Sequence, residues 1–425
     1  MLKKLTQNSL FQDTGIYTIT SIINAGIPFL LLPILTRYLS PEDYGLISMF
    51  ALLVSFVSPF IGISINGAIS RQYFNREDLN IWEYVFNCLL ILAINSIITF
   101  LIFVNFSRLI TKVTSFPEQS LWMVIVFAFS QIVINVLLSL WQVQKKALYY
   151  GMFNNFKTLI NLGLSILLVV IFGFGWKGRI YGQLWAVIIF SIIALAIIIK
   201  NGWIKVSFKK RYVYHALLFG VPLIPHALSG TIISMTDRIF ITNMVGLAAT
   251  GVYTVGYQIG SVIDLITSSF NNAYVPWLFE RLKRNNHETN KKIVTFTYGY
   301  FIGIIILALI LGIVAPPLLK VFLGKSFNDS SAYVIWIAAG YAFNGMYLMV
   351  VNYIFYSQKN SLLAMVTFLT ALINIVLNYF FVRNFGAIGA AQATTLVFFT
   401  KFIMVWILSA KVHKMPWKDV LLRRD

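Results

Sequence analysis

Long apolar runs recur along the whole of this chain, and only short polar loops separate them. An α-helix needs about 20 predominantly apolar residues to cross the hydrocarbon core of a bilayer. Of the 425 residues, 59% are hydrophobic and 11% are charged, whereas a soluble domain carries about a quarter charged residues. The sequence therefore predicts an all-α polytopic membrane protein with twelve transmembrane helices. The predicted spans are 16–39, 45–65, 85–106, 120–143, 156–174, 180–199, 216–241, 251–270, 293–314, 332–356, 362–382 and 388–410.

The basic residues indicate how the chain is oriented. The formal net charge is +19, which in a soluble protein would favour a nucleic-acid partner. Here the charges lie in short loops between apolar runs, so no nucleic-acid partner is expected. Lys and Arg are far more numerous in one set of loops and in both tails than in the opposite loops. Because cytoplasmic loops of membrane proteins carry the excess of basic residues, both termini are predicted to be cytoplasmic.

Few residues of the chain suit covalent or metal chemistry. The single cysteine, Cys88, lies in an apolar run, and the four histidines are scattered. Metal sites built from Cys and His need clustered ligands, so we expect no metal site and no cofactor. The loops predicted on the outer side are short, which leaves no room for a catalytic domain. The sequence therefore predicts no catalytic residues and a protein that is not an enzyme.

Two halves of the chain repeat a pattern. A ten-residue segment that starts at Thr and ends at Gly follows the first predicted span, at 36–45, and another follows the seventh, at 242–251. The second segment lies 206 positions after the first, which is about half the chain. Two domains of six helices are therefore predicted, 1–205 and 206–425, with the basic loop 200–211 as linker. With six spans per half, both halves have the same orientation and flank a central cavity.

Three motifs resemble those of a known family. The first is RYLSPEDYG at 37–45, and the second is GVPLIP at 220–225 followed by TDRIFI at 236–241. The third is GAIGAA at 386–391, where the last span opens. Together they resemble the polysaccharide and O-antigen flippases of the multidrug/oligosaccharidyl-lipid/polysaccharide (MOP) exporter superfamily, and the likeness covers essentially the whole chain.

The resemblance implies a fold and a function. Members of the family have two six-helix lobes in a V and move undecaprenyl-diphosphate-linked oligosaccharide from the inner to the outer leaflet by alternating access. By resemblance, the chain would reside in the bacterial cytoplasmic (inner) membrane and carry an O-antigen or other surface polysaccharide repeat unit. Partners would be the lipid-linked oligosaccharide, membrane lipids and other assembly proteins, such as a polymerase and a chain-length regulator. The alternatives are a cation-coupled multidrug exporter, although span 16–39 lacks an acidic residue, and a membrane glycan-processing enzyme.

Ionisable residues inside the predicted spans are the main candidates for a site. Each costs roughly 2.5 to 3.5 kcal/mol in the bilayer centre, so such residues line a cavity or pair with one another. We expect Lys401 and Arg238 to bind the diphosphate, and Arg71 to contact it on the cytoplasmic side. Asp264 and Asp237 are candidates for coupling transport to an H⁺ or Na⁺ gradient. The alternatives are a structural ion pair between Asp264 and Lys401, an interfacial cluster at 237–238 and a topology anchor at Arg71.

Uncharged polar residues of the spans could contact sugar hydroxyls. The candidates are Asn66, Asn272, Tyr257 and Gln258. Asn66 and Asn272 lie 206 positions apart, as the repeat requires, and Tyr257 lies four residues after Tyr253 on one helical face. The alternative is that these side chains bond or pack between helices.

Overall fold

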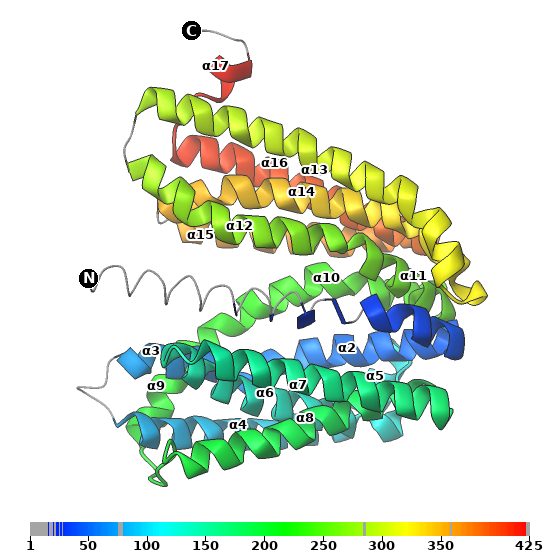
Figure 1. Ribbon diagram of the computed structural model, residues 1–425, viewed down its shortest axis with the longest axis vertical. Coiled ribbons are helices and arrows are strands. Elements are labelled where there is room, and N and C mark those ends of the chain that lie inside the picture. Colours follow the sequence, from blue (N-terminus) through cyan, green and yellow to red (C-terminus); the bar gives the residue numbers. More distant parts are fainter. Residues whose placement is uncertain are drawn as a thin grey trace. The chain divides into compact units, whose positions relative to one another are not determined.

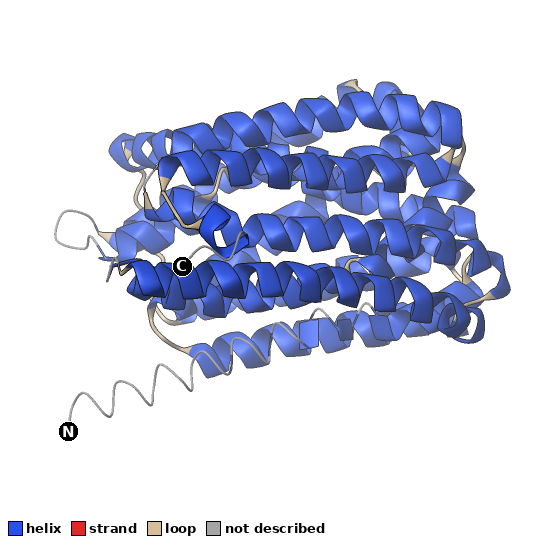
Figure 2. Cartoon of the chain, turned by 90° about the horizontal axis from the view of Figure 1, so that it is seen from above, coloured by secondary structure: helices blue, strands red, loops and turns tan. Residues whose placement is uncertain are grey.

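The computed structural model describes residues 29–74, 80–283, 286–357 and 359–421, together with six positions between 16 and 27. Within these residues the chain forms helices joined by loops, and no strand occurs (Figure 2). Contacts divide it into two compact units, Met1–Thr231 and Ile232–Asp425, and the boundary lies inside helix α10, Ile224–Met244.

The first unit is built around one enclosed helix. Its elements are helix Phe29–Tyr38, α2 (Pro41–Gly62), α3 (Ile65–Phe74), α4 (Ile81–Asn105), α5 (Ser107–Thr114), η1 (Glu118–Ser120), α6 (Trp122–Val143), α7 (Ala147–Ile166), η2 (Leu167–Ile171), α8 (Gly175–Lys200), α9 (Lys210–Gly220) and η3 (Val221–Leu223) (Figure 1). Helix α6 packs against α2, α3, α4 and α8, and most of its span is buried. The other helices surround it and expose apolar side chains outward, as helices in lipid require.

Local sequence explains where these helices begin and end. Ser40 accepts a hydrogen bond from the backbone N–H of Asp43, whose carboxylate accepts one from the N–H of Ser40, and Pro41 follows in the first turn of α2. This capping box satisfies amides that the helix leaves open. Asn80 caps α4 in a similar way, with its side-chain oxygen accepting from the N–H groups of Trp82 and Glu83. The SPED part of the first motif is therefore a helix start.

The loop between α8 and α9 packs against the start of α4. Glu83 of α4 lies 2.9 Å from the Nζ of Lys205 and 2.6 Å from the Nζ of Lys209, and the Trp82 and Trp203 rings stack 6.1 Å apart. The sequence predicted a domain boundary at 205/206, in this loop. That boundary stays a prediction. The two compact units divide after residue 231 instead, so α9 belongs to the first unit.

The second unit is built around α14. It comprises the end of α10, then α11 (Leu247–Gly260), α12 (Val262–Lys283), α13 (His287–Phe322), η4 (Lys325–Ser330), α14 (Ser331–Tyr356), α15 (Asn360–Phe385), α16 (Ala387–Val412) and α17 (Trp417–Leu421) (Figure 1). Helix α14 packs against α11, α12, α13 and α16, so it lies at the centre of this unit.

The membrane fold that the sequence predicted is confirmed. Nine described helices are long and apolar enough to cross a bilayer, and a pair bent by 41°, Lys210–Leu223 and Ala227–Met244, makes a tenth. Seven of the 24 residues of the predicted first span, 16–39, lie outside the described residues, and Phe29–Tyr38 within it forms one helix. The predicted eighth span is divided between α11 and α12 at Ser261. The count of twelve is consistent with these helices.

Candidate functional site

Asp237 and Arg238 lie in the interior of the second unit. Their exposed fractions are 1% and 6%. The Arg238 Nη1 lies 3.3 Å from Asp237 Oδ1 and donates a 2.6 Å hydrogen bond to the backbone carbonyl of Ser234, one turn earlier in α10. A buried charge needs a partner and hydrogen bonds, and both are present here. Both charges are therefore compensated inside the unit, and the alternative of an interfacial cluster stays a prediction.

Tyrosines from two other helices enclose the pair. The Tyr253 hydroxyl of α11 donates a hydrogen bond to Asp237 Oδ2. The Arg238 guanidinium carbon lies 4.4 Å from the centroid of the Tyr257 ring, within the range of a cation–π interaction. The hydroxyls of Tyr257 and Tyr341, the latter on α14, are 2.7 Å apart. The Arg238 charge is therefore fixed in place by α10, α11 and α14 together.

A second polar group joins α12, α14 and α16. Lys401 Nζ donates a 2.9 Å hydrogen bond to Asn344 Oδ1, and Asn344 Nδ2 donates a 3.3 Å bond to Asp264 Oδ1. Lys401 and Asp264 thus lie close together, which the alternative of a structural ion pair also requires. An amide stands between them, and among the described residues no ion pair forms between the two. All three side chains are partly exposed.

Aromatic rings accompany the Lys401 ammonium. Its nitrogen lies 3.9 Å from the centroid of Tyr347 and 5.4 Å from that of Phe398. The Phe398 ring in turn lies 5.5 Å from the ring of Tyr341. Contacts therefore run continuously from Arg238, through Tyr257 and Tyr341, to Lys401. We call this the C-unit polar network.

Sequence reasoning missed the residues of α14 in this network. Tyr341, Asn344 and Tyr347 follow one another at intervals of three residues, so they share a helical face. Polar and aromatic side chains at that spacing within an apolar span were the available signal. The face is central because α14 is the helix around which the unit packs.

The remaining predicted residues lie elsewhere. Arg71 is exposed in the last turn of α3, and its guanidinium carbon lies 5.6 Å from the ring centroid of Phe219. Asn66, also on α3, and Gln258 on α11 are partly exposed. Asn272 is exposed on α12. Its neighbour Asn271 is the residue that accepts a 2.9 Å hydrogen bond from Asn352 of α14, so the buried amide contact belongs to 271.

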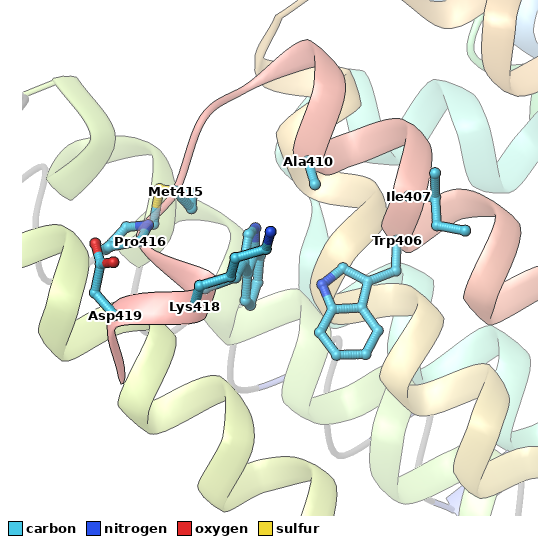
Figure 3. Close-up of a pocket in the computed structure, with 8 residues that line it drawn as sticks. Trp406, Ile407, Ala410, Met415, Pro416, Lys418 and Asp419 are labelled. Carbon is cyan, nitrogen blue, oxygen red and sulfur yellow. The ribbon is translucent and has the colours of Figure 1, made fainter. Parts of the chain in front are cut away.

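Polar side chains also line cavities outside the C-unit polar network. One cavity, of about 240 Å³, lies inside the first unit among Phe29–Tyr38 and the residues before it, α6, α7 and α8. Another, of about 500 Å³, lies where α16 meets α17. Trp406 projects from α16 on one side of it, and Pro416, Lys418 and Asp419 lie on the other (Figure 3). The described residues contain no group of His, Cys, Asp and Glu placed to hold a metal ion.

The family of the chain follows from a match over most of its length. Residues 10–282 match the family of polysaccharide biosynthesis proteins. The chain belongs to this family. The match includes the first unit and the Asp237–Arg238 pair, and the resemblance drawn from the three sequence motifs is confirmed.

Two relatives match the chain over nearly its whole length. A protein of the Lsg locus of Haemophilus influenzae is 27% identical over 375 residues, covering 86% of this chain and 89% of the relative. A protein of Haloferax volcanii named as a probable low-salt glycan biosynthesis flippase, Agl15, is 20% identical over 384 residues, covering 89% of this chain and 79% of the relative.

Solved structures share the fold. The lipid II flippase MurJ in an inward closed conformation has a TM-score of 0.74 at 16% identity, covering 97% of this chain and 89% of that one. A multidrug resistance MATE family transporter of the MOP superfamily, in an inward-facing conformation, also has a TM-score of 0.74, at 13% identity and 96% coverage of both chains. The chain therefore has the fold of the MOP superfamily, and the fold alone does not distinguish between these two kinds of transporter.

Proposed function

We propose that this protein is a flippase that carries a diphosphate-linked, lipid-anchored oligosaccharide from the inner to the outer leaflet of the bacterial cytoplasmic membrane. The family assignment and the naming of the Haloferax relative as a probable glycan flippase support this proposal. Alternating access would move the cargo without covalent chemistry. Both termini would be cytoplasmic, and a polymerase and a chain-length regulator would act on the product.

One observation carries the proposal: Lys401 is a partly exposed cation within an apolar span, and its partner is a neutral amide. The ammonium has three N–H donors, and the hydrogen bond to Asn344 occupies one of them. The ring of Tyr347 stabilises the charge without neutralising it. Such a group is suited to a phosphate oxygen. Arg238 is less suited, because Asp237 already compensates its charge.

The neighbouring carboxylate has a separate role in this proposal. Among the described residues, the Asp264 carboxylate accepts one hydrogen bond, from Asn344 at 3.3 Å, and the side chain is partly exposed. We propose that Asp264 binds a coupling proton or sodium ion. Binding there would alter the hydrogen bond from Asn344 to Asp264 and, through the Asn344 amide, the hydrogen bond from Lys401. Asn66, Asn272, Tyr257 and Gln258 stay candidates for sugar contacts, and Arg71 and Arg238 stay candidates for further diphosphate contacts.

The test is to delete the protein in its host and determine on which leaflet lipid-linked glycan accumulates. We expect accumulation on the inner leaflet, and accumulation on the outer leaflet would contradict a flippase. Lys401→Ala should reproduce the deletion, whereas Lys401→Arg, which keeps the charge, should restore surface glycan. Lys411→Ala, at the exposed end of the same helix, is the matched control. Normal surface glycan with Lys401→Ala would remove Lys401 from the mechanism.

A cation-coupled multidrug exporter is the second candidate, because the MATE transporter matches the fold as well as MurJ does. The same deletion strain separates the two. An exporter predicts increased sensitivity to cationic drugs with normal surface glycan, and the flippase predicts the opposite pattern. A glycan-processing enzyme would instead leave lipid-linked glycan of altered structure on the outer leaflet.

A further inference from the structure

The cavity inside the first unit is lined by two cations and by no carboxylate among the described residues. Lys157 of α7 and Arg179 of α8 are its charged side chains, and the neutral polar ones include Asn24, Gln131 and Asn161. The predicted spans 156–174 and 180–199 put Lys157 at the start of one span and Arg179 in the loop before the next. Both lie within helices, because α7 begins at Ala147 and α8 at Gly175.

Arg179 is buried and oriented, yet it has donors to spare. Its exposed fraction is 8%. Nη1 donates hydrogen bonds to Asn161 Oδ1 at 2.8 Å and to Ser165 Oγ at 2.6 Å. A guanidinium has five N–H donors, so these bonds fix its plane and leave the donors of Nε and Nη2. Within the described part of the chain, no carboxylate lies within ion-pair distance of it.

Lys157 provides a second, loosely held charge. Its Nζ lies 3.5 Å from Gln131 Oε1, at the limit of a hydrogen bond. Gln131 is itself positioned by donating a 2.9 Å bond to Asn135. Thr158, the next residue of α7, donates a hydrogen bond to Asn24, whose amide donates a 3.0 Å bond to Asn155. The wall around the ammonium is thus ordered, while the ammonium itself is available.

Two cations in an apolar unit favour binding of a compensating anion. A charge taken out of water is costly unless it is paired, and among the described residues each of these cations has only neutral partners. A planar guanidinium and an ammonium that line one cavity are suited to a phosphate group, because the guanidinium binds two oxygens and the ammonium adds a point charge. At about 240 Å³ the cavity is smaller than pockets for drug-sized ligands, which hold about 300 to 1,000 Å³. It therefore suits a small anion and excludes a whole oligosaccharide.

We propose that this cavity is a phosphate or diphosphate site, with Arg179 and Lys157 as its ligands. The anion has two possible sources, which share this chemistry. As a station for the diphosphate of a lipid-linked glycan, the site rests on the proposed function. As a site for free inorganic pyrophosphate, it does not.

Binding to the purified full-length protein in detergent tests the proposal without transport. The probes are inorganic pyrophosphate and farnesyl diphosphate, measured by calorimetry. We expect wild type to bind at least one probe, and Lys157→Gln and Arg179→Gln each to weaken binding about tenfold or more. Lys177→Gln, an exposed position two residues before Arg179 on α8, should bind as wild type. Lys157→Arg should retain binding.

The outcomes separate the sources and the two proposals. Equal binding of both probes supports a free-anion site, and binding of farnesyl diphosphate alone supports the lipid source. Failure of wild type to bind either probe, or unchanged binding in the Lys157→Gln/Arg179→Gln double variant, overturns the site. The leaflet assay is independent of this result, so flipping can fail while binding holds, and the reverse. Size-exclusion profiles identify variants that do not fold, and Lys157→Gln, at a partly exposed position, keeps the test decisive if Arg179→Gln is among them.

Discussion

At the scale of single residues, the charged side chains of the second unit have two different kinds of environment. Asp237 and Arg238 are buried and compensate each other, with Tyr253 and Ser234 completing their hydrogen bonds. Lys401 is partly exposed and bonded to an amide. A compensated pair stabilises a particular packing, whereas a cation with a neutral partner can still receive a ligand. We therefore expect the Asp237–Arg238 pair to matter for folding and Lys401 to matter for transport.

Variants of the buried pair test its structural role. Arg238→Gln leaves the Asp237 carboxylate buried without a counter-charge, which should cost about 3 to 5 kcal/mol of unfolding free energy. Asp237→Asn/Arg238→Gln removes both charges and should cost less than the sum of the two single changes. Thermal unfolding in detergent measures this, with Arg383→Gln at an exposed helix end as a control that should shift stability by less than about 0.5 kcal/mol. Additive costs would show that the pair does not act as a unit.

His413 gives the second unit a dependence on pH. It follows α16 and lies against the rings of Tyr353 and Tyr356, at centroid distances of 5.8 and 5.7 Å. Burial lowers the pKa of His413 below its ordinary value. The unfolded chain therefore takes up the proton more readily than the folded chain. The contribution of neutral His413 to the free energy of unfolding is complete above about pH 6.5, its ordinary pKa. It is lost as the pH falls through the lowered pKa of the folded state.

The variant His413→Phe should remove this part of the acid sensitivity, because the ring contacts persist without a titrating group. The measurement is the Tm between pH 5 and 8 for wild type and variant. The exposed His287 supplies the control His287→Gln, which should follow wild type. A wild-type pH profile in His413→Phe would exclude His413 as the source.

Much of the charged site could be predicted from sequence, and the reason is energetic. Ionisable residues are rare in apolar spans, so Asp264 and Lys401 stood out and the structure brings them together. The amide that joins them did not stand out, because Asn occurs in many spans as a packing residue. Arg179 was missed because it lies close to a loop in sequence, and only the start of α8 at Gly175 places it inside a helix.

At the scale of elements, apolar runs located the helices but not their ends. Hydropathy reports the length that crosses hydrocarbon, and helices continue into the polar regions on either side. Helix α13 has 36 residues, His287–Phe322, whereas the apolar run predicted 293–314.

The glycines of the motifs are explained by close packing between helices. A Cβ added to Gly389 of α16 would lie 2.1 Å from the backbone carbonyl oxygen of Phe381 on α15.

Gly389→Ala should therefore force α15 and α16 apart. Since the obstructing atom belongs to the backbone, it cannot move aside as a side chain would, and we expect a cost of about 1 to 3 kcal/mol or more. The control is Gly303→Ala on α13, where an added Cβ meets nothing within 4 Å, so stability should be unchanged or slightly raised. Thermal unfolding of the two variants side by side is the measurement, and equal Tm values would contradict the packing argument.

At the scale of the whole molecule, the predicted orientation in the membrane depends on the number of spans and on the unequal distribution of Lys and Arg between the two sets of loops. Six spans per half give both halves one orientation, and the loops with most Lys and Arg then lie in the cytoplasm. Orientation is therefore a prediction of the charge distribution, and it needs a test in both halves of the chain.

Cysteine labelling provides that test, because Cys88 is buried and should not react. Arg108→Cys on α5 and Lys320→Cys in the last turn of α13 occupy exposed positions that the sequence predicts on the outer side of the membrane. Both should react with a membrane-impermeant maleimide added to intact spheroplasts. Lys411→Cys, exposed at the end of α16, should react only after the membrane is opened. If Arg108→Cys were labelled but Lys320→Cys protected, an odd number of spans would separate the two positions. The halves would then be inverted relative to each other, and a duplication of six-span units in one orientation would be wrong.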